Sequence, residues 1–120
     1  MGLDIYFSRA KKKEWREYSK GEPVDLYSTF KTGDPNSNEV VSTYPGEADG
    51  CPAMWNIGYF RNRYDLLEDD YIEMCIYEVP LEKVKEWYKN LKDEESYIGN
   101  WLLCILSTFT DDDVLLVFYY

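Results

Sequence analysis

Three runs of adjacent carboxylates are the side chains best suited to hold a cation, at residues 68–70, 93–95 and 111–113. Carboxylate oxygens are the ligands that Mg²⁺ and Ca²⁺ prefer. Consecutive side chains point in different directions, however, and none of the runs has the D-x-D-x-D-G spacing of a calcium-binding loop. We therefore interpret the runs as solvated turns and helix ends, and expect neither a metal ion nor another cofactor.

Histidine is absent from the chain, and so are the glycine-rich motifs that bind phosphate. Histidine is the commonest general base, the usual activator of a serine or cysteine nucleophile and the commonest metal ligand. The sequence therefore excludes triad hydrolases, histidine-relay nucleases and the nucleotide-binding enzymes that use those motifs. We expect a binding protein and not an enzyme. Of three hypotheses, the first two are binding functions, and the third is an enzyme that uses carboxylates and a metal ion.

Aromatic residues are abundant, with 12 tyrosines and 4 tryptophans among 120 residues. Such side chains are enriched at binding hot spots because they combine a large apolar area with a polar atom. In the segment 59–73, acidic groups would steer a basic partner while the rings anchor it. For each ring, the alternative is a place in the core or on a sheet face. The expected partner-binding residues are Tyr59, Tyr64, Asp65, Glu68, Asp69, Asp70, Tyr71 and Glu73.

The net charge of −10 is unevenly distributed. Residues 1–63 contain nine Lys and Arg against nine Asp and Glu, whereas residues 64–120 contain four Lys against 14 Asp and Glu, a net of −10. Such a field repels nucleic acid and membrane surfaces and attracts cationic partners. The first hypothesis is therefore an inhibitor that masks a basic protein, such as a nucleic-acid-binding enzyme or a toxin. The charge distribution does not indicate an oligomeric state.

One basic run supports the second hypothesis, an accessory protein that binds nucleic acid. Cations can neutralise phosphates while interleaved aromatic rings stack on bases. Glu14 and Glu17 interrupt the run, and the negative charge of the whole chain opposes this function, so a solvated helix face is the favoured interpretation. The residues of this alternative site are Arg9, Lys11, Lys12, Lys13, Trp15 and Arg16.

Cysteine usage and hydropathy indicate a cytoplasmic protein. Cys51, Cys75 and Cys104 are far apart and odd in number, which does not fit a disulfide framework. The first residues lack the order of a signal peptide, and no segment approaches the roughly 20 apolar residues that span a bilayer. We expect Cys75 and Cys104 in the core and Cys51 in an exposed loop.

The periodicity of apolar residues predicts one α+β domain over residues 1–120, mainly an antiparallel sheet with two to four helices packed on it. Residues 31–53 are expected to form an irregular, loop-rich insertion. The final strand is apolar on both faces, which places it in the interior of the sheet. The expected strands are residues 3–7, 24–30, 40–44, 71–79 and 114–120, of which the second and third form a hairpin.

Four segments have the spacing of helices. Ser8 and Gly21 are suited to the two ends of the first, and Pro80 fits the first position of the third, where its missing N–H costs nothing. Residues 101–109 and 114–120 are alternatively two strands joined by the acidic turn between them. The expected helices are residues 8–20, 54–68, 80–91 and 98–109.

Three short stretches resemble a loose group of small bacteriophage and prophage proteins of unknown function. They are the opening MGLDIYF, the sequence IGYFRNR at residues 57–63 and the closing VFYY at residues 117–120. Proteins of this group begin with MGLD and an aromatic residue, carry a helix with a Tyr-aromatic-Arg sequence and end in a tyrosine-rich strand. The resemblance implies a mobile-element origin, and the first hypothesis then becomes a phage counter-defence factor or a toxin-neutralising immunity protein. A further alternative is a phage domain of unknown function with no acidic interface.

Overall fold

The first and last strands of the chain lie side by side in the sheet. Strands β1 (Asp4–Lys11) and β5 (Asp113–Tyr119) pair antiparallel, with Ile5 opposite Tyr119 and Lys11 opposite Asp113. Residues 113–118 of β5 are all buried, which is typical of a strand with neighbours at both edges and cover on both faces. The predicted interior position of this strand is confirmed.

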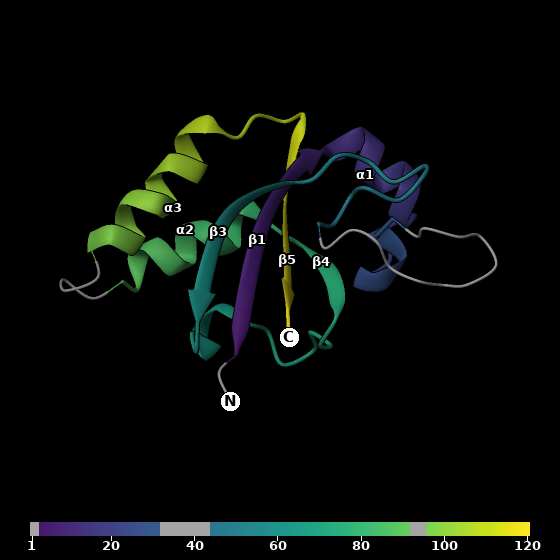
Figure 1. The fold of residues 1–120 in the computed structure, drawn as a ribbon. Coiled ribbons are helices and arrows are strands. Elements are labelled where there is room, and N and C mark those ends of the chain that lie inside the picture. Colours follow the sequence, from purple (N-terminus) through teal and green to yellow (C-terminus); the bar gives the residue numbers. More distant parts are fainter. Residues whose placement is uncertain (1–2, 32–43, 92–95) are drawn as a thin grey trace.

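The sheet contains five antiparallel strands in the order β2-β4-β5-β1-β3 (Figure 1). The computed structural model describes residues 3–31, 44–91 and 96–120, which form an α+β domain with three α-helices in the described part. The predicted fold class is therefore confirmed. The other elements are β2 (Val24–Asp25), β3 (Trp55–Arg61), β4 (Cys75–Val79), α1 (Lys12–Ser19), α2 (Leu81–Lys89), α3 (Ser96–Thr108) and the short 3₁₀ helices η1 (Leu26–Thr29) and η2 (Tyr64–Leu66).

Helices α2 and α3 cover one face of the sheet, called the two-helix face below (Figure 1). Their apolar stripes meet the side chains that alternate residues of β1 and β5 direct to this face. The result is a closed core cluster, consistent with the burial of a sheet face against helices. Its buried members are Ile5, Phe7, Leu66, Val79, Val84, Ile98, Leu102, Ile105, Leu115 and Val117.

The opposite face, called the α1 face, carries α1 and η1. Helix α1 follows β1 directly and ends at Lys20, which has the left-handed φ of 57° that often terminates a helix. Trp15 is the large side chain that α1 buries against this face. The buried members of this second cluster are Ala10, Trp15, Leu26, Ile76, Val114, Leu116 and Phe118.

Edge strand β3 is attached to α3 through Trp101. The indole Nε1 donates a hydrogen bond of 2.8 Å to the carbonyl oxygen of Ile57, and the ring packs edge-on against Phe7 and Phe60 at centroid distances of 5.0 and 4.8 Å. Gly58 permits this approach, because a Cβ atom there would lie 2.6 Å from Trp101 Cζ2. A bulge in the pairing between β1 and β3 falls at Phe7 and Ser8, beside the same contact.

The helix predicted at residues 54–68 is wrong. The segment forms β3 and then η2. Ile57 and Phe60 have helical spacing, but both also face the core from a strand that contains a bulge. The run Trp-Asn-Ile-Gly-Tyr-Phe is rich in aromatic residues and includes a glycine, which favours a strand over a helix. The helix that the phage resemblance implies for IGYFRNR is therefore also a strand here.

Two further boundaries differ from the prediction. Ser8 is buried in β1 opposite Leu116, and the first helix begins four residues later. Of the predicted strand at residues 24–30, two residues pair with β4 before η1 begins, because Asp25 accepts a hydrogen bond from the N–H of Tyr27 and starts a turn. The predicted strand at residues 40–44 lies outside the described residues except for Tyr44, which is in a bend.

The later elements follow the prediction more closely. The helix predicted after Pro80 is α2, and the apolar segment before the acidic turn is helix α3 and not a strand. Strand β4 starts at Cys75, four residues later than expected, after Met74 with a φ of 67°. Residues 45–52 form turns and loop, as the clustered prolines and glycines predict.

Candidate binding site

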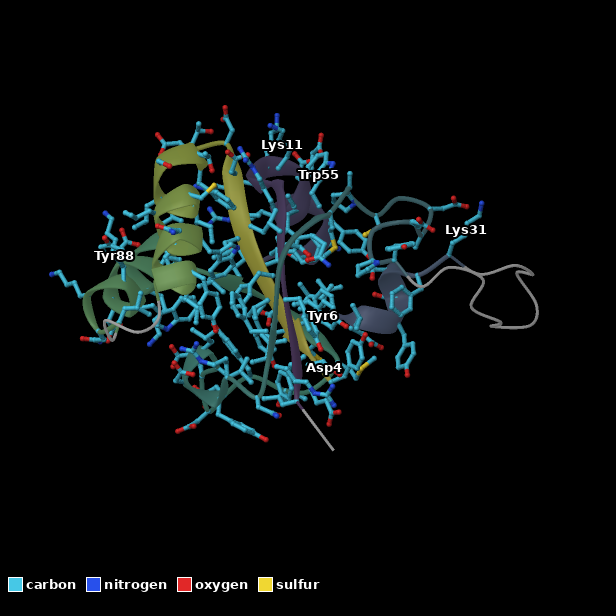
Figure 2. The ribbon with its side chains drawn as sticks, turned by 60° about the vertical axis from the view of Figure 1, so that its left-hand side comes forward. Asp4, Tyr6, Lys11, Lys31, Trp55 and Tyr88 are labelled. Atoms are coloured by element: carbon cyan, nitrogen blue, oxygen red, sulfur yellow. The ribbon has the colours of Figure 1, made fainter. Side chains whose placement is uncertain are left out.

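A cavity of about 300 Å³ lies on the α1 face, between β1, β5 and the connection that precedes β3. Tyr6 projects toward it from β1, on the side of the sheet away from α3 (Figure 2). Helix α1 covers the other end of this face and does not reach the cavity. The lining residues are Tyr6, Ser8, Phe30, Tyr44, Pro45, Met54, Asn56, Phe118 and Tyr120.

Strand pairing places the inner wall of the cavity. Tyr6 lies opposite Phe118 in the β1–β5 ladder, and alternation along the strands brings Ser8 and Tyr120 to the same face. The Tyr6 ring stacks on Phe118 at 5.3 Å and on Tyr120 at 5.4 Å between centroids, and it lies 5.0 Å from the ring of Tyr59 on β3. Tyr6 is therefore the centre of an aromatic cluster whose rings come from β1, β3 and the C-terminal end of β5.

The phenol groups of this cluster are linked by hydrogen bonds. Tyr120 donates to the Tyr6 oxygen at 3.3 Å, and Tyr59 donates to the Asp4 carboxylate. The pKa of Tyr6 is raised far above its ordinary value, mainly by the hydrogen bond with Tyr120 and secondly by burial. The bond to Asp4 likewise raises the pKa of Tyr59. Both phenols therefore stay protonated and uncharged at neutral pH.

Two polar side chains lie among the apolar walls. Ser8 is only 3% exposed. Its side chain borders the cavity and makes no hydrogen bond to another described residue. Asn56, opposite Ser8 in the β1–β3 ladder, accepts a hydrogen bond of 3.2 Å from the N–H of Gly58. No Asp, Glu, Lys or Arg side chain is among the described residues that line the cavity. The described lining therefore combines aromatic walls with a neutral polar floor.

Seven of the eight predicted partner-binding residues lie on the connection between β3 and β4, and Tyr59 lies on β3 itself. The connection between β3 and β4 lies at the end of the sheet where β1 begins and β5 ends (Figure 1). Two hydrogen bonds hold it there, one from Met74 N to Tyr119 O and one from Tyr119 Oη to Tyr71 O. Tyr64 is 66% exposed on this connection. Tyr59 is farther along, on the α1 face beside Tyr6.

These residues are not equally available to a partner. Arg63 holds the Asp65 carboxylate through two hydrogen bonds of 2.9 and 2.7 Å, and Lys83 Nζ lies 2.6 Å from Glu68. Tyr71 is half-buried and stacks on Tyr77, and its burial raises its pKa. The acidic residues of this segment without an ion pair to any described cation are Asp69, Asp70 and Glu73.

The basic run is largely engaged in structural contacts. Arg9 lies 2.6 Å from Asp113 and its guanidinium stands 4.8 Å over the Phe109 ring. This hydrogen bond is the main cause that lowers the pKa of Asp113 to about 2. Arg16 pairs with Glu78 at 3.2 Å. Trp15 is buried, so its ring is not open to a base, whereas Lys11, Lys12 and Lys13 border a shallow depression with Asp111 and Asp112.

None of the three cysteines has the burial expected for it, and Cys75, expected in the core, is only partly buried in β4. Cys104 is exposed on α3 and Cys51 is half-buried beside Tyr18, while all three thiols are free. Cys104 follows Leu103 on the outer side of the helix, because the apolar run from residue 101 is wider than the stripe that contacts the sheet. Burial raises the pKa of the Cys51 thiol, which reduces its nucleophilicity at neutral pH.

None of the described cavity residues was among the sequence candidates. The alternation of Asp4, Tyr6 and Ser8 opposite a fully apolar β5 was a readable sign of a polar, aromatic sheet face. No signal in the sequence connected Phe30, Tyr44 or Met54 to that face, because the connecting segments lack periodicity.

Searches for other kinds of site add no further candidate. In the described ranges, no three Cys, Asp or Glu side chains converge as a metal site would require. Within the same ranges, no helix has both the length and the apolar character needed to cross a membrane. Comparison with protein-family models, with curated proteins and with solved structures found no match to this chain.

Proposed function

We propose that this chain is a binding protein that masks a basic surface of a partner protein. The contact surface that we propose is the acidic tyrosine end, defined as Tyr64, Asp69, Asp70, Ile72 and Glu73. The observation that carries the proposal is the combination of exposed large side chains with unpaired carboxylates on one connection. Tyr64 and Ile72 are 66% and 65% exposed, on either side of Asp69 and Asp70.

The charge of this segment supports a cationic target. Residues 59–73 contain five acids and two arginines, a net of −3, and both arginines already contact carboxylates, Arg61 at Asp4 and Arg63 at Asp65. Exposed charges of this kind contribute little to stability but speed the encounter with an oppositely charged surface. Tyrosine and isoleucine side chains then supply the apolar area that holds the complex.

The class of target follows from the same features. A strongly basic surface is typical of nucleic-acid-binding enzymes and of toxins that act on nucleic acid. The resemblance to phage and prophage proteins supports a counter-defence or toxin-neutralising role in the cytoplasm of a bacterial host. Direct binding of nucleic acid has less support, because Trp15 is buried and Arg9 and Arg16 are paired with acids.

The experiment compares two charge-matched triple variants. Asp69→Asn, Asp70→Asn and Glu73→Gln neutralise the proposed surface, whereas Glu14→Gln, Glu17→Gln and Glu22→Gln remove the same charge from exposed positions on and after α1. Immobilised wild type and both variants capture proteins from a bacterial lysate at low salt, and mass spectrometry quantifies them. A purified captured protein is then titrated by calorimetry against all three.

We expect the first triple variant to lose a basic protein that wild type and the control variant retain. Its dissociation constant should rise by at least tenfold, since three attractive charges are lost near the contact. Equal capture and equal affinity for all three proteins would show that this end of the sheet is not the contact surface.

A further inference from the structure

We propose that the cavity on the α1 face binds a neutral aromatic ring system that carries one hydrogen-bonding group, of the phenol or indole class. The proposal concerns a different face from the acidic tyrosine end and does not depend on it. Three observations carry it: the composition of the walls, a Ser8 hydroxyl without a hydrogen bond to a described residue, and the lack of Asp, Glu, Lys and Arg among the described lining residues.

The walls are suited to a ring. Tyr6, Phe118 and Tyr120 form a nearly parallel aromatic layer, with interplanar angles of 15° and 21° about Tyr6. Phe30, Tyr44 and Met54 approach from the connecting segments. Aromatic rings favour offset-stacked and edge-on neighbours, and thioethers pack well against them. A flat apolar ligand would therefore gain contacts on both sides that a chain-like ligand would not.

The polar atom comes from the floor of the cavity. The Ser8 side chain belongs to a residue that is 97% buried, because its exposed fraction is 3%, yet its hydroxyl has no hydrogen-bond partner among the described residues. A hydroxyl that borders a cavity and makes no hydrogen bond to a described residue can donate a hydrogen bond to a ligand there or accept one from it. Asn56 lies opposite Ser8 and also borders the cavity. One polar group on the ligand is enough to satisfy this floor.

The charge of the surroundings selects a neutral ligand. Asp4, which lies on the same face of β1 as Tyr6, is 4.0 Å from Arg61, and these two charges oppose each other. An ion that enters a cavity without a counter-charge loses its hydration and gains no partner. The phenols of Tyr6 and Tyr59 remain protonated, so they supply no negative charge.

The size of the cavity sets the size of the ligand. An apolar cavity of about 150 Å³ is sufficient to bind benzene in other proteins, and this cavity has about twice that volume, at about 300 Å³. A fused two-ring group fits this space better than a single ring. Such a group occurs both as a free metabolite and as a tryptophan side chain of a partner protein.

The test uses three small probes and heteronuclear NMR titration of the full chain. Indole carries a ring N–H, indene has the same shape without it, and tryptamine adds a positive charge. We expect indole to shift the resonances of residues 6, 8, 56 and 118 and to bind more tightly than the other two. Tighter binding of tryptamine than of indole would overturn the neutral-ligand proposal, and so would the absence of shifts at these residues.

Variants connect the binding to the residues named. Ser8→Ala should weaken indole by about fivefold to tenfold, the effect of one hydrogen bond, and leave indene unchanged. Tyr44→Ala removes a wall that is 70% exposed and should weaken both probes, whereas Tyr97→Ala, 66% exposed on α3, is the matched control and should change neither. An equal effect of Ser8→Ala on indole and indene would contradict the role of the hydroxyl.

A last pair of titrations identifies the source of the ring. N-acetyltryptophanamide represents a partner side chain with its backbone, and indole represents a free metabolite. Similar affinity of the two would assign the cavity to a tryptophan of a partner protein. Binding of indole alone would assign it to a small molecule. Because these measurements need no basic partner and leave Asp69, Asp70 and Glu73 untouched, their failure is separate from failure of the proposed function.

Discussion

The two faces of the sheet are built from the same strands but differ in how completely they are covered. On the two-helix face, Ile5 and Phe7 have no exposed surface and meet two helices. On the α1 face, Tyr6 and Ser8 lie on the same strand and line a cavity, because α1 covers only one end. A small domain can in this way keep one sheet face for stability and leave part of the other for binding.

The largest effect should come from the closed face. Phe7→Ala removes a ring that packs edge-on against Phe60, Trp87 and Trp101, and we expect a loss of about 3–5 kcal/mol in the free energy of unfolding. Tyr6→Ala, one residue earlier, should cost less because its ring already borders a cavity. Urea unfolding of both variants measures the difference. Equal losses would contradict the division between the two faces.

A smaller effect is expected at the contact between β3 and α3. Gly58→Ala should reduce the free energy of unfolding by about 1–3 kcal/mol through overpacking, because the new Cβ would lie 2.6 Å from the Trp101 ring. The double variant with Trp101→Leu should lose less than the sum of the two single variants. Strict additivity in thermal or urea unfolding would show that the two residues do not contact each other.

The ion pair at the start of β5 predicts a dependence of stability on pH. The pKa of Asp113 is lowered from 3.8 to about 2, so its stabilisation is fully present above pH 4 and is lost as the pH falls through 2. We expect about 1–2 kcal/mol to disappear in this window after allowance for solvent screening. Asp113→Asn should remove that part of the pH dependence, whereas the exposed neighbour Asp112→Asn should retain it.

The smallest effect on stability is expected at the acidic tyrosine end. Asp69→Asn, Asp70→Asn and Glu73→Gln should each change the free energy of unfolding by no more than about 0.5 kcal/mol, as is usual for exposed residues. Calorimetric melting temperatures measure this directly. A large destabilisation would mean that these carboxylates have a structural role, and the loss of partner capture by the triple variant could then not be assigned to binding.

Local signals predicted the elements whose structure depends on local sequence. Pro80 and the apolar stripe after it identify α2, and the apolar run of residues 114–118 identifies an interior strand. The sequence could not reveal β3 in the same way. Gly58 makes room for the Trp101 ring, which lies more than 40 residues later in the chain, and a strand with a bulge can place apolar residues at helical spacing.

The candidate sites differ in the same way, because one lies within a single segment and the other is formed by segments far apart in the sequence. Tyr64, Asp69 and Asp70 were predicted from one continuous segment, and all three are exposed in the structure. Asp65 and Glu68 were grouped with them, although Arg63 and Lys83 hold their carboxylates. The cavity required three strands and two connections to meet, so only its β1 wall was visible in the alternation of polar and apolar residues.

The contact of Trp101 with β3 also affects how this protein behaves at high concentration. An edge strand with unsatisfied backbone groups is a template on which other chains can add and form aggregates. Here the Trp101 indole donates a hydrogen bond to the carbonyl of Ile57, and the Asn56 side chain accepts one from the N–H of Gly58. The bulge also interrupts the regular spacing of the backbone groups. The edge that carries Trp55 and Tyr59 therefore offers another chain fewer regularly spaced backbone groups with which to pair.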